Sequence, residues 1–139
     1  DTPPPTVSGS LHVGSAFGFA HQDSIARFQR MRGKNVFFPM GWDDNGLPTE
    51  RRVANYYGIR CDPSLPYDPN FQIPEKPDAK RKVPCSRPNF IELCEKLTGE
   101  DEKEFEDVWR RLGLSVDWQF TYNTIGATAR KTNGRKIFL

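Results

Sequence analysis

The segment that decides the fold is Pro3-Pro4-Pro5-Thr6-Val7-Ser8-Gly9-Ser10-Leu11-His12-Val13-Gly14-Ser15. Proline fixes φ and lacks an N–H donor, so residues 3–5 are expected to lie extended at the end of a strand. Gly9 and Gly14 then allow the backbone to approach a ligand closely. A helix that begins at this point presents free N–H groups and its positive dipole end, which favour an anion. The segment therefore predicts a cradle for a phosphate group.

Polar side chains surround the predicted start of the helix. Hydroxyls come from several serines, and His12 can donate a hydrogen bond to a phosphate oxygen. No second histidine lies within a helical turn of His12, so no metal site is predicted there. The candidate residues for binding the anion are Gly9, His12, Gly14 and Ser15.

The residues that follow predict an α/β fold. Apolar spacing of three and four predicts a helix over 12–32 that ends at Gly33, and the apolar run 35–40 predicts a strand buried on both faces. Together with a strand over 2–8, this order predicts two parallel neighbouring strands joined by a right-handed crossover. The predicted packing face of the helix comprises Phe17, Ala20, His21, Ser24, Phe28 and Met31.

A second site-like stretch, Gly41-Trp42-Asp43-Asp44-Asn45-Gly46-Leu47-Pro48-Thr49-Glu50, follows the second strand. Ligands of open parallel sheets bind beyond the carboxyl ends of the strands. Asp43 lies nearest the strand end, facing the same crevice as the prolines, where it could bind a cationic group of a substrate. For Asp44 and Asn45 we favour a structural role as caps of a short helix over 49–57.

The second part of the chain reads as a connection followed by helices. Seven prolines punctuate residues 61–88, and the basic run 80–82 lies within them. Ser86 is expected to cap a helix that reaches Leu97, and acidic residues are expected to begin a further helix over 100–112. An extended segment over 115–122 and a last, basic helix capped by Thr124 or a near neighbour complete the prediction.

Composition restricts the function only weakly. The 139 residues suffice for one domain with a core, and 20 basic against 18 acidic side chains are too balanced to indicate a nucleic-acid binder. The sequence has neither an apolar run long enough for a membrane span nor a secretory signal, so we expect a cytoplasmic protein. Three cysteines without a Cys-x-x-Cys pair do not predict a zinc site.

The two motifs together resemble a known family. The stretch 3–14, followed about thirty residues later by 41–50, resembles the first half of a class I aminoacyl-tRNA synthetase. Within that class it is similar to the valyl-tRNA synthetases, in particular to bacterial enzymes of an archaeal-like type. The resemblance extends over nearly the whole chain, through 60–69 and 109–118.

The resemblance implies both a fold and an activity. Residues 1–60 would form the first half of a Rossmann-like nucleotide-binding fold, and 61–139 a Pro-rich connection and helices leading toward an editing insertion. The activity would be ATP-dependent activation of valine to valyl-adenylate and transfer of the valyl group to tRNA-Val. The expected substrates are valine, ATP with Mg²⁺, and tRNA-Val, with no membrane partner and a monomeric full-length enzyme.

The resemblance also assigns roles to residues. His12 and Gly14 match the family's His-Ile-Gly-His signature, in which the imidazole contacts the phosphates and the glycine lets adenine or ribose lie against the backbone. Pro4, through its carbonyl, and Asp43, through its carboxylate, match positions that hold the amino group of the amino acid. Thr6 lies beside them.

Two departures from the family pattern affect the expected activity. Ser15 stands where the valyl family has the second histidine of its signature, and loss of one transition-state contact typically costs about 10²–10³ in rate. The chain also lacks the second half of the nucleotide fold with its Lys-Met-Ser-Lys-Ser loop. We therefore expect the 139 residues alone to be inactive. The alternative is a truncated paralogue that binds nucleotide or a partner without ligating anything.

Overall fold

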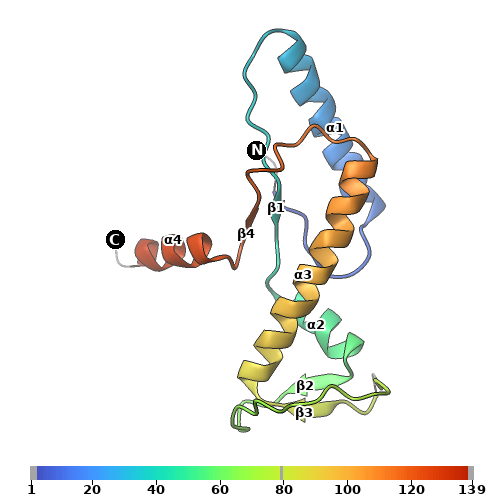
Figure 1. The fold of residues 1–139 in the computed structure, drawn as a ribbon, viewed down its shortest axis with the longest axis vertical. Helices are drawn as coiled ribbons and strands as arrows, with labels where there is room; N and C mark the ends of the chain where they lie inside the picture. The colour runs from blue at the N-terminus through green and yellow to red at the C-terminus, as the bar shows by residue number, and fades with distance from the viewer. Residues whose placement is uncertain (1–2, 79, 138–139) are drawn as a thin grey trace.

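The structure, a computed structural model, describes residues 3–78 and 80–137. The long helix α3 runs beside the central strands, with α1 toward one end and α2, β2 and β3 at the other (Figure 1). No helix among the described residues is long and apolar enough to cross a membrane. The elements are α1 (Val13–Met31), β1 (Gly41–Trp42), α2 (Leu47–Tyr56), β2 (Ile59–Cys61), β3 (Val83–Cys85), α3 (Arg87–Arg111), β4 (Tyr122–Asn123) and α4 (Ala127–Ile137).

Three parallel extended segments form the centre of the molecule, with β1 in the middle. On one side β1 pairs in parallel with β4, and on the other Asp43 forms a parallel bridge with Thr6. The Asp43 N–H donates to the Pro5 carbonyl at 3.0 Å, and the Val7 N–H donates to the Asp43 carbonyl at 2.9 Å. The predicted parallel arrangement is confirmed at this bridge. The expected strand 2–8, whose residue 2 lies outside the described residues, contributes only this bridge.

The second predicted strand, 35–40, is wrong in position, because regular pairing begins only at Gly41. The Phe38 N–H donates to the Asp117 carboxylate at 2.9 Å, and the Asp117 N–H donates to the Phe38 carbonyl at 2.8 Å. Pro39 has no N–H to offer a neighbouring strand. Burial on both faces is also wrong for this run, since Phe37 is 67% exposed.

Helix α1 has the predicted bounds but presents the opposite face to the core. Its buried residues are Phe19, Asp23 and Ala26, whereas Met31 of the predicted face is 85% exposed. The buried face is fixed by Asp23, which accepts hydrogen bonds from the Ser115 N–H at 2.7 Å and the Ser115 hydroxyl at 2.5 Å. This interaction spans 92 residues of chain, so the local apolar pattern could not reveal it.

Helix α3 is one continuous helix where two were predicted. Ser86 caps it as expected, since its hydroxyl accepts a hydrogen bond from the Asn89 N–H at 3.3 Å. The expected break among the acidic residues does not occur because Asp101 is buried and forms an ion pair with Arg52 at 3.2 Å. Gly99 therefore lies in the interior of the helix, with open space where a Cβ would be.

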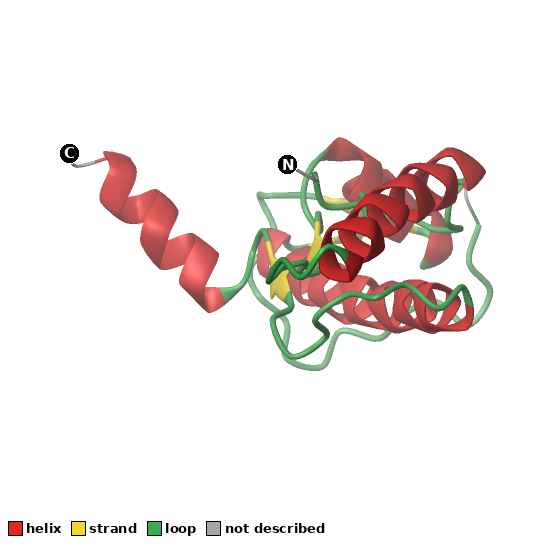
Figure 2. Cartoon of the chain, turned by 90° about the horizontal axis from the view of Figure 1, so that it is seen from above, coloured by secondary structure: helices red, strands yellow, loops and turns green. Residues whose placement is uncertain are grey.

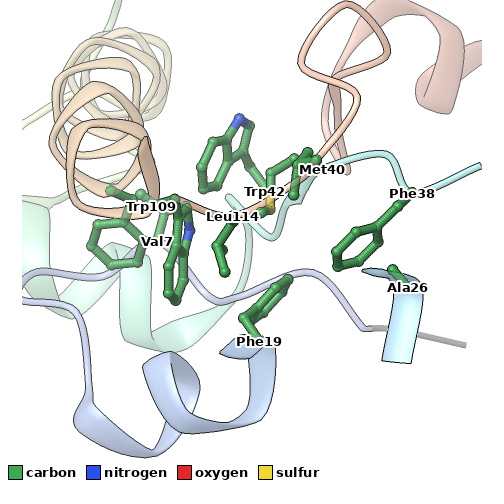
Figure 3. Close-up of a cluster of buried hydrophobic side chains, with 10 residues drawn as sticks. Val7, Phe19, Ala26, Phe38, Met40, Trp42, Trp109 and Leu114 are labelled. Atoms are coloured by element: carbon green, nitrogen blue, oxygen red, sulfur yellow. The ribbon is translucent and has the colours of Figure 1, made fainter. Parts of the chain in front are cut away.

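Two hydrophobic clusters hold these elements together. In the first, Trp109 of α3 is fully buried and its ring lies 5.0 Å from that of Phe19 of α1 (Figure 3). The other buried members of this cluster are Val7, Ala26, Phe38, Met40, Trp42, Phe105, Leu114 and Val116. The second cluster, between α2, α3 and the β2–β3 pair, comprises Val53, Tyr57, Ile59, Cys85, Phe90 and Leu97.

One further feature differs from the sequence-based expectation. The parallel pair β2–β3 was not predicted, and it joins the two ends of the Pro-rich segment, with Ile59 opposite Val83 and Cys61 opposite Cys85. The last helix begins at Ala127, close to Thr124 as expected, and extends away from the other elements (Figure 2).

The continuity of α3 predicts opposite effects of two glycine substitutions. Gly99→Ala should stabilise the protein by about 0.5–1 kcal/mol, because alanine is the better helix former and the space is open. Gly113→Ala should destabilise it, because Gly113 follows the helix with a φ of 71°. Urea unfolding of both variants measures the difference. A loss of stability in Gly99→Ala would contradict a continuous α3.

Candidate functional site

The central carboxylate of the site is that of Asp43, at the carboxyl end of β1. Side chains alternate along parallel strands, so Thr6, Asp43 and Thr124 project from the same face of the three segments. The Thr6 hydroxyl donates to one Asp43 carboxylate oxygen at 3.2 Å, and the Thr124 hydroxyl donates to the other at 3.3 Å. The half-buried carboxylate is therefore oriented by a hydroxyl from each neighbouring segment.

The contact of Thr124 with Asp43 was not predicted from the sequence, which offered Thr124 or a near neighbour as the cap of the last helix. Its hydroxyl accepts hydrogen bonds from the Asp44 N–H at 3.2 Å and the Asn45 amide at 2.9 Å. It thus fixes the turn after β1 as well as the Asp43 carboxylate. Its placement beside β1 depends on a pairing across about eighty residues, which the local sequence does not reveal.

A cavity of about 250 Å³ lies on this face, at Gly41, two residues before Asp43. Pro4 and Gly41 line the cavity. Pro4 lies two residues before Thr6, and Gly41 lies two residues before Asp43, the residue that bridges to Thr6. Gly41 has no room for a Cβ because the ring of Tyr122 lies directly against it. The remaining lining residues are Phe19, Phe37, Phe38 and Pro39.

The cradle at the start of α1 is built around the His12 ring. His12 is the N-cap of the helix, and its Nδ1 accepts a hydrogen bond from the Gly14 N–H at 3.0 Å. A neutral imidazole with Nδ1 as acceptor carries its proton on Nε2, which is then the donor available to an anion. A Cβ on residue 14 would lie 2.9 Å from Nδ1, so glycine at this position allows the ring to sit there.

The other predicted cradle residues lie around this ring. Gly9 has a φ of 118°, which favours glycine, and the Arg52 side chain lies beside it. Ser15 is half-buried in the first turn of α1, where its N–H donates to the His12 carbonyl at 2.9 Å.

Asp44, the neighbour of Asp43, points to the opposite face and is only 3% exposed. The interpretation of Asp44 and Asn45 as helix caps is wrong, because Gly46 is the N-cap of α2 and no side chain caps this helix. Neither Asp44 carboxylate oxygen has a hydrogen-bond partner among the described residues. Burial, followed by the nearby Glu102 carboxylate, raises the pKa of Asp44 to about 7.

No three or more His, Cys, Asp or Glu side chains of the described part of the chain are grouped so as to hold a metal ion. These residues therefore offer Mg²⁺ no site built from protein ligands alone.

Burial raises the pKa of the Cys94 thiol to about 11, so this thiol is protonated at neutral pH.

The family follows from a comparison with known proteins. A family model of the class I tRNA synthetases (I, L, M and V) matches residues 1–138. The chain belongs to the class I tRNA synthetases. The predicted resemblance is thereby confirmed.

Three curated relatives of this class I segment are named valine–tRNA ligase. A valine–tRNA ligase of Thermobifida fusca is 73% identical over 130 residues, which cover 94% of this chain and 15% of that protein. A valine–tRNA ligase of Cutibacterium acnes is 66% identical over 131 residues, again 94% and 15%. A valine–tRNA ligase of Bifidobacterium longum is 64% identical over the whole of this chain and 16% of its own length. The chain thus spans about 15% of these relatives.

The buried aspartates Asp44 and Asp23 predict opposite dependences of the protein's stability on pH. The folded state raises the pKa of Asp44 from 3.8 to about 7, so it binds this proton more tightly than the unfolded chain does. Stability should therefore fall as pH rises from about 4 to about 7, by up to about 4 kcal/mol. Asp44→Asn should remove this loss, which urea unfolding at several pH values measures.

Asp23→Asn is the matched control. Burial alone would raise the pKa of Asp23, but hydrogen bonds from Ser115 and Arg27 outweigh it and lower the pKa. Its contribution is therefore present above pH 3.8 and lost as pH falls, so Asp23→Asn should destabilise the protein at pH 7. The same pH slope in Asp44→Asn and wild type would contradict the account of Asp44.

Proposed function

We propose that this chain is the amino-terminal catalytic portion of a cytoplasmic valine–tRNA ligase. The observation that carries the proposal is the Asp43 carboxylate, held by two hydroxyls on the face that also carries the cavity lined by Pro4 and Gly41. Relatives named valine–tRNA ligase, at 64–73% identity, support the choice of amino acid. In this proposal residues 1–60 supply the first half of the nucleotide-binding fold, and 61–139 form the Pro-rich connection and the helices after it, with β4 returning to pair with β1.

The amino acid would bind on the face that carries Asp43. An ammonium group can pair with the Asp43 carboxylate, whose two oxygens are already oriented, and can donate to the Pro4 carbonyl. The branched apolar side chain would occupy the cavity of about 250 Å³ beside Pro4 and Gly41. The hydroxyl of Thr6 would keep the Asp43 carboxylate oriented toward the ammonium group.

ATP would bind at the start of α1. The His12 Nε2 donates to a phosphate oxygen, and the positive dipole end of α1 faces the same charge. Gly9 and Gly14 let the Arg52 side chain and the His12 ring lie against the backbone beside the nucleotide, and Ser15 offers a hydroxyl.

The reaction needs no covalent nucleophile from the protein. The valine carboxylate attacks the α-phosphate of ATP, the bond to the β-phosphate breaks, and pyrophosphate leaves as valyl-adenylate forms. A hydroxyl of the terminal ribose of tRNA-Val then attacks the valyl carbonyl and AMP leaves. These side chains would contribute position and electrostatic stabilisation, and no step is assigned to a metal. The complete enzyme would act as a monomer.

The hydroxyl pair around Asp43 predicts a graded effect in the longer enzyme that carries this segment. Thr124→Ala should raise the KM for valine about 3–10-fold in ATP–pyrophosphate exchange, because the lost hydrogen bond is worth about 0.5–1.5 kcal/mol. Thr124→Ser keeps the hydroxyl and should restore most of the affinity. The KM for ATP should stay constant in both. Equal KM values for valine in the two variants would contradict the orienting role of Thr124.

A substitution at Ser15 is expected to change the exchange rate rather than the KM for valine. Ser15→His in the longer enzyme should raise the valine-dependent exchange rate with little change in the KM for valine, because residue 15 lies on the ATP side. The 139-residue chain alone should bind ATP weakly and show no exchange, since it offers only the helix-start side of the phosphate site. Robust exchange by the chain alone would show that this account of the site is wrong.

A further inference from the structure

Two of the three cysteines face each other across the parallel pair β2–β3. Cys61 of β2 and Cys85 of β3 are partners in the register of this pair. Neighbouring strands lie about 4.7–4.9 Å apart, and paired residues project their side chains from the same face of a sheet. Disulfides usually join residues whose Cα atoms are about 4.4–6.8 Å apart. The pairing of β2 with β3 therefore places the two cysteines at bridging distance.

The thiols themselves also lie close together. The Cys85 thiol points toward β2, where it donates to the carbonyl of Arg60, the residue before Cys61, at 3.5 Å. Burial, followed by the charge of the neighbouring Cys61, raises the pKa of Cys85. In the structure both are free thiols. The pair is thus present in its reduced form, with the two sulfurs near enough to influence each other.

The two cysteines differ in their access to solvent. Cys85 is only 1% exposed and belongs to the second hydrophobic cluster, whereas Cys61 is half-buried and packs against the edge of that cluster. A dissolved oxidant therefore meets Cys61 first, and Cys85 is reached only through Cys61. A half-exposed thiol beside a buried one is the arrangement of an attacking and a resolving cysteine.

We propose that Cys61 and Cys85 form a reversible disulfide with glutathione disulfide as the oxidant. The Cys61 sulfur loses its proton and attacks one sulfur of glutathione disulfide, whose S–S bond breaks, and one glutathione leaves. The Cys85 sulfur then loses its proton and attacks the Cys61 sulfur, and the second glutathione leaves. Two protein thiols are oxidised to one disulfide, and one glutathione disulfide is reduced to two glutathione molecules, which take up the two protons.

The bond would close the Pro-rich segment, residues 61–85, into a ring. Because Cys85 directly precedes Ser86, the cap of α3, the bond would also fasten the start of this helix to β2 (Figure 1). Disulfides of cytoplasmic proteins are usually transient and redox-sensing, so this bond would form under oxidising conditions and be reduced afterwards. The inference goes beyond the proposed function, because none of these residues belongs to the candidate site.

Cys94 is the competing partner. It is half-buried in α3, packs against the same cluster, and is much closer to Cys85 in sequence than Cys61 is. In an unfolded chain the shorter loop costs less entropy, so a Cys85–Cys94 bond is favoured there. A Cys61–Cys85 bond is favoured only when β2 and β3 are paired. The position of the bond therefore reports whether the fold directs it.

Peptide mapping of the longer enzyme tests the proposal. The protein is equilibrated with mixtures of glutathione and glutathione disulfide, free thiols are blocked with N-ethylmaleimide, and the protein is digested with trypsin and a protease that cleaves after glutamate. Cleavage after Glu92 separates Cys85 from Cys94. The Cys61 peptide should be joined to the Cys85 peptide. The bridged fraction should depend on the square of the glutathione concentration divided by that of its disulfide, whereas a mixed disulfide depends on the simple ratio.

Three variants separate the roles of the cysteines. Cys61→Ser should abolish the joined peptide, and Cys85→Ala should stop the reaction at a mixed disulfide between Cys61 and glutathione. Cys94→Ser is the matched control from the same cluster, and it should leave the bridged fraction unchanged. Oxidation in concentrated urea should move the bond to Cys85 and Cys94. A Cys85–Cys94 bond in the folded protein, a mixed disulfide as the final wild-type product, or no oxidation of Cys61 would each overturn the proposal.

Discussion

The parallel pairing of β1 between the Thr6 segment and β4 is the constraint on which the other features depend. It determines the faces to which the side chains of Asp43 and Asp44 project. Asp43 projects to the open face, between two hydroxyls, whereas Asp44 projects to the buried face beside Glu102. A register shift of one residue would exchange the two, because side chains alternate along a strand. The site is therefore specified by backbone pairing as much as by the identity of its carboxylate.

Helix α3 keeps that pairing in place, because it belongs to both hydrophobic clusters. Phe105 and Trp109 pack beneath β1, and Phe90 and Leu97 pack beneath the β2–β3 pair. Full burial of a large aromatic side chain contributes on the order of 1.5–3 kcal/mol, which exceeds the cost of one helical glycine. The packing of both clusters thus outweighs the local tendency of the acidic, glycine-containing middle of α3 to break the helix.

Features set by neighbouring residues were predicted from the sequence, and features set by distant partners were not. The bounds of α1 and the Ser86 cap depend on a few adjacent residues and are confirmed. The buried face of α1 depends on Ser115, and the start of β1 depends on Asp117. The motif residues could be identified in advance for the same reason, whereas Thr124 reaches Asp43 only through tertiary pairing.

The cradle shows how the fold can supply charge that the sequence motif lacks. The His12 ring offers one donor, since its Nδ1 is occupied by the Gly14 N–H, and Ser15 adds only a short hydroxyl. Arg52 lies against Gly9, where a larger residue would meet its side chain at 3.6 Å. The hydrogen bonds from Arg52 to Asp101, partly opposed by burial, raise the pKa of Arg52, so the guanidinium remains charged. The Asp101 carboxylate in turn offsets part of the positive charge of Arg52. The positive charge beside the cradle therefore comes from α2.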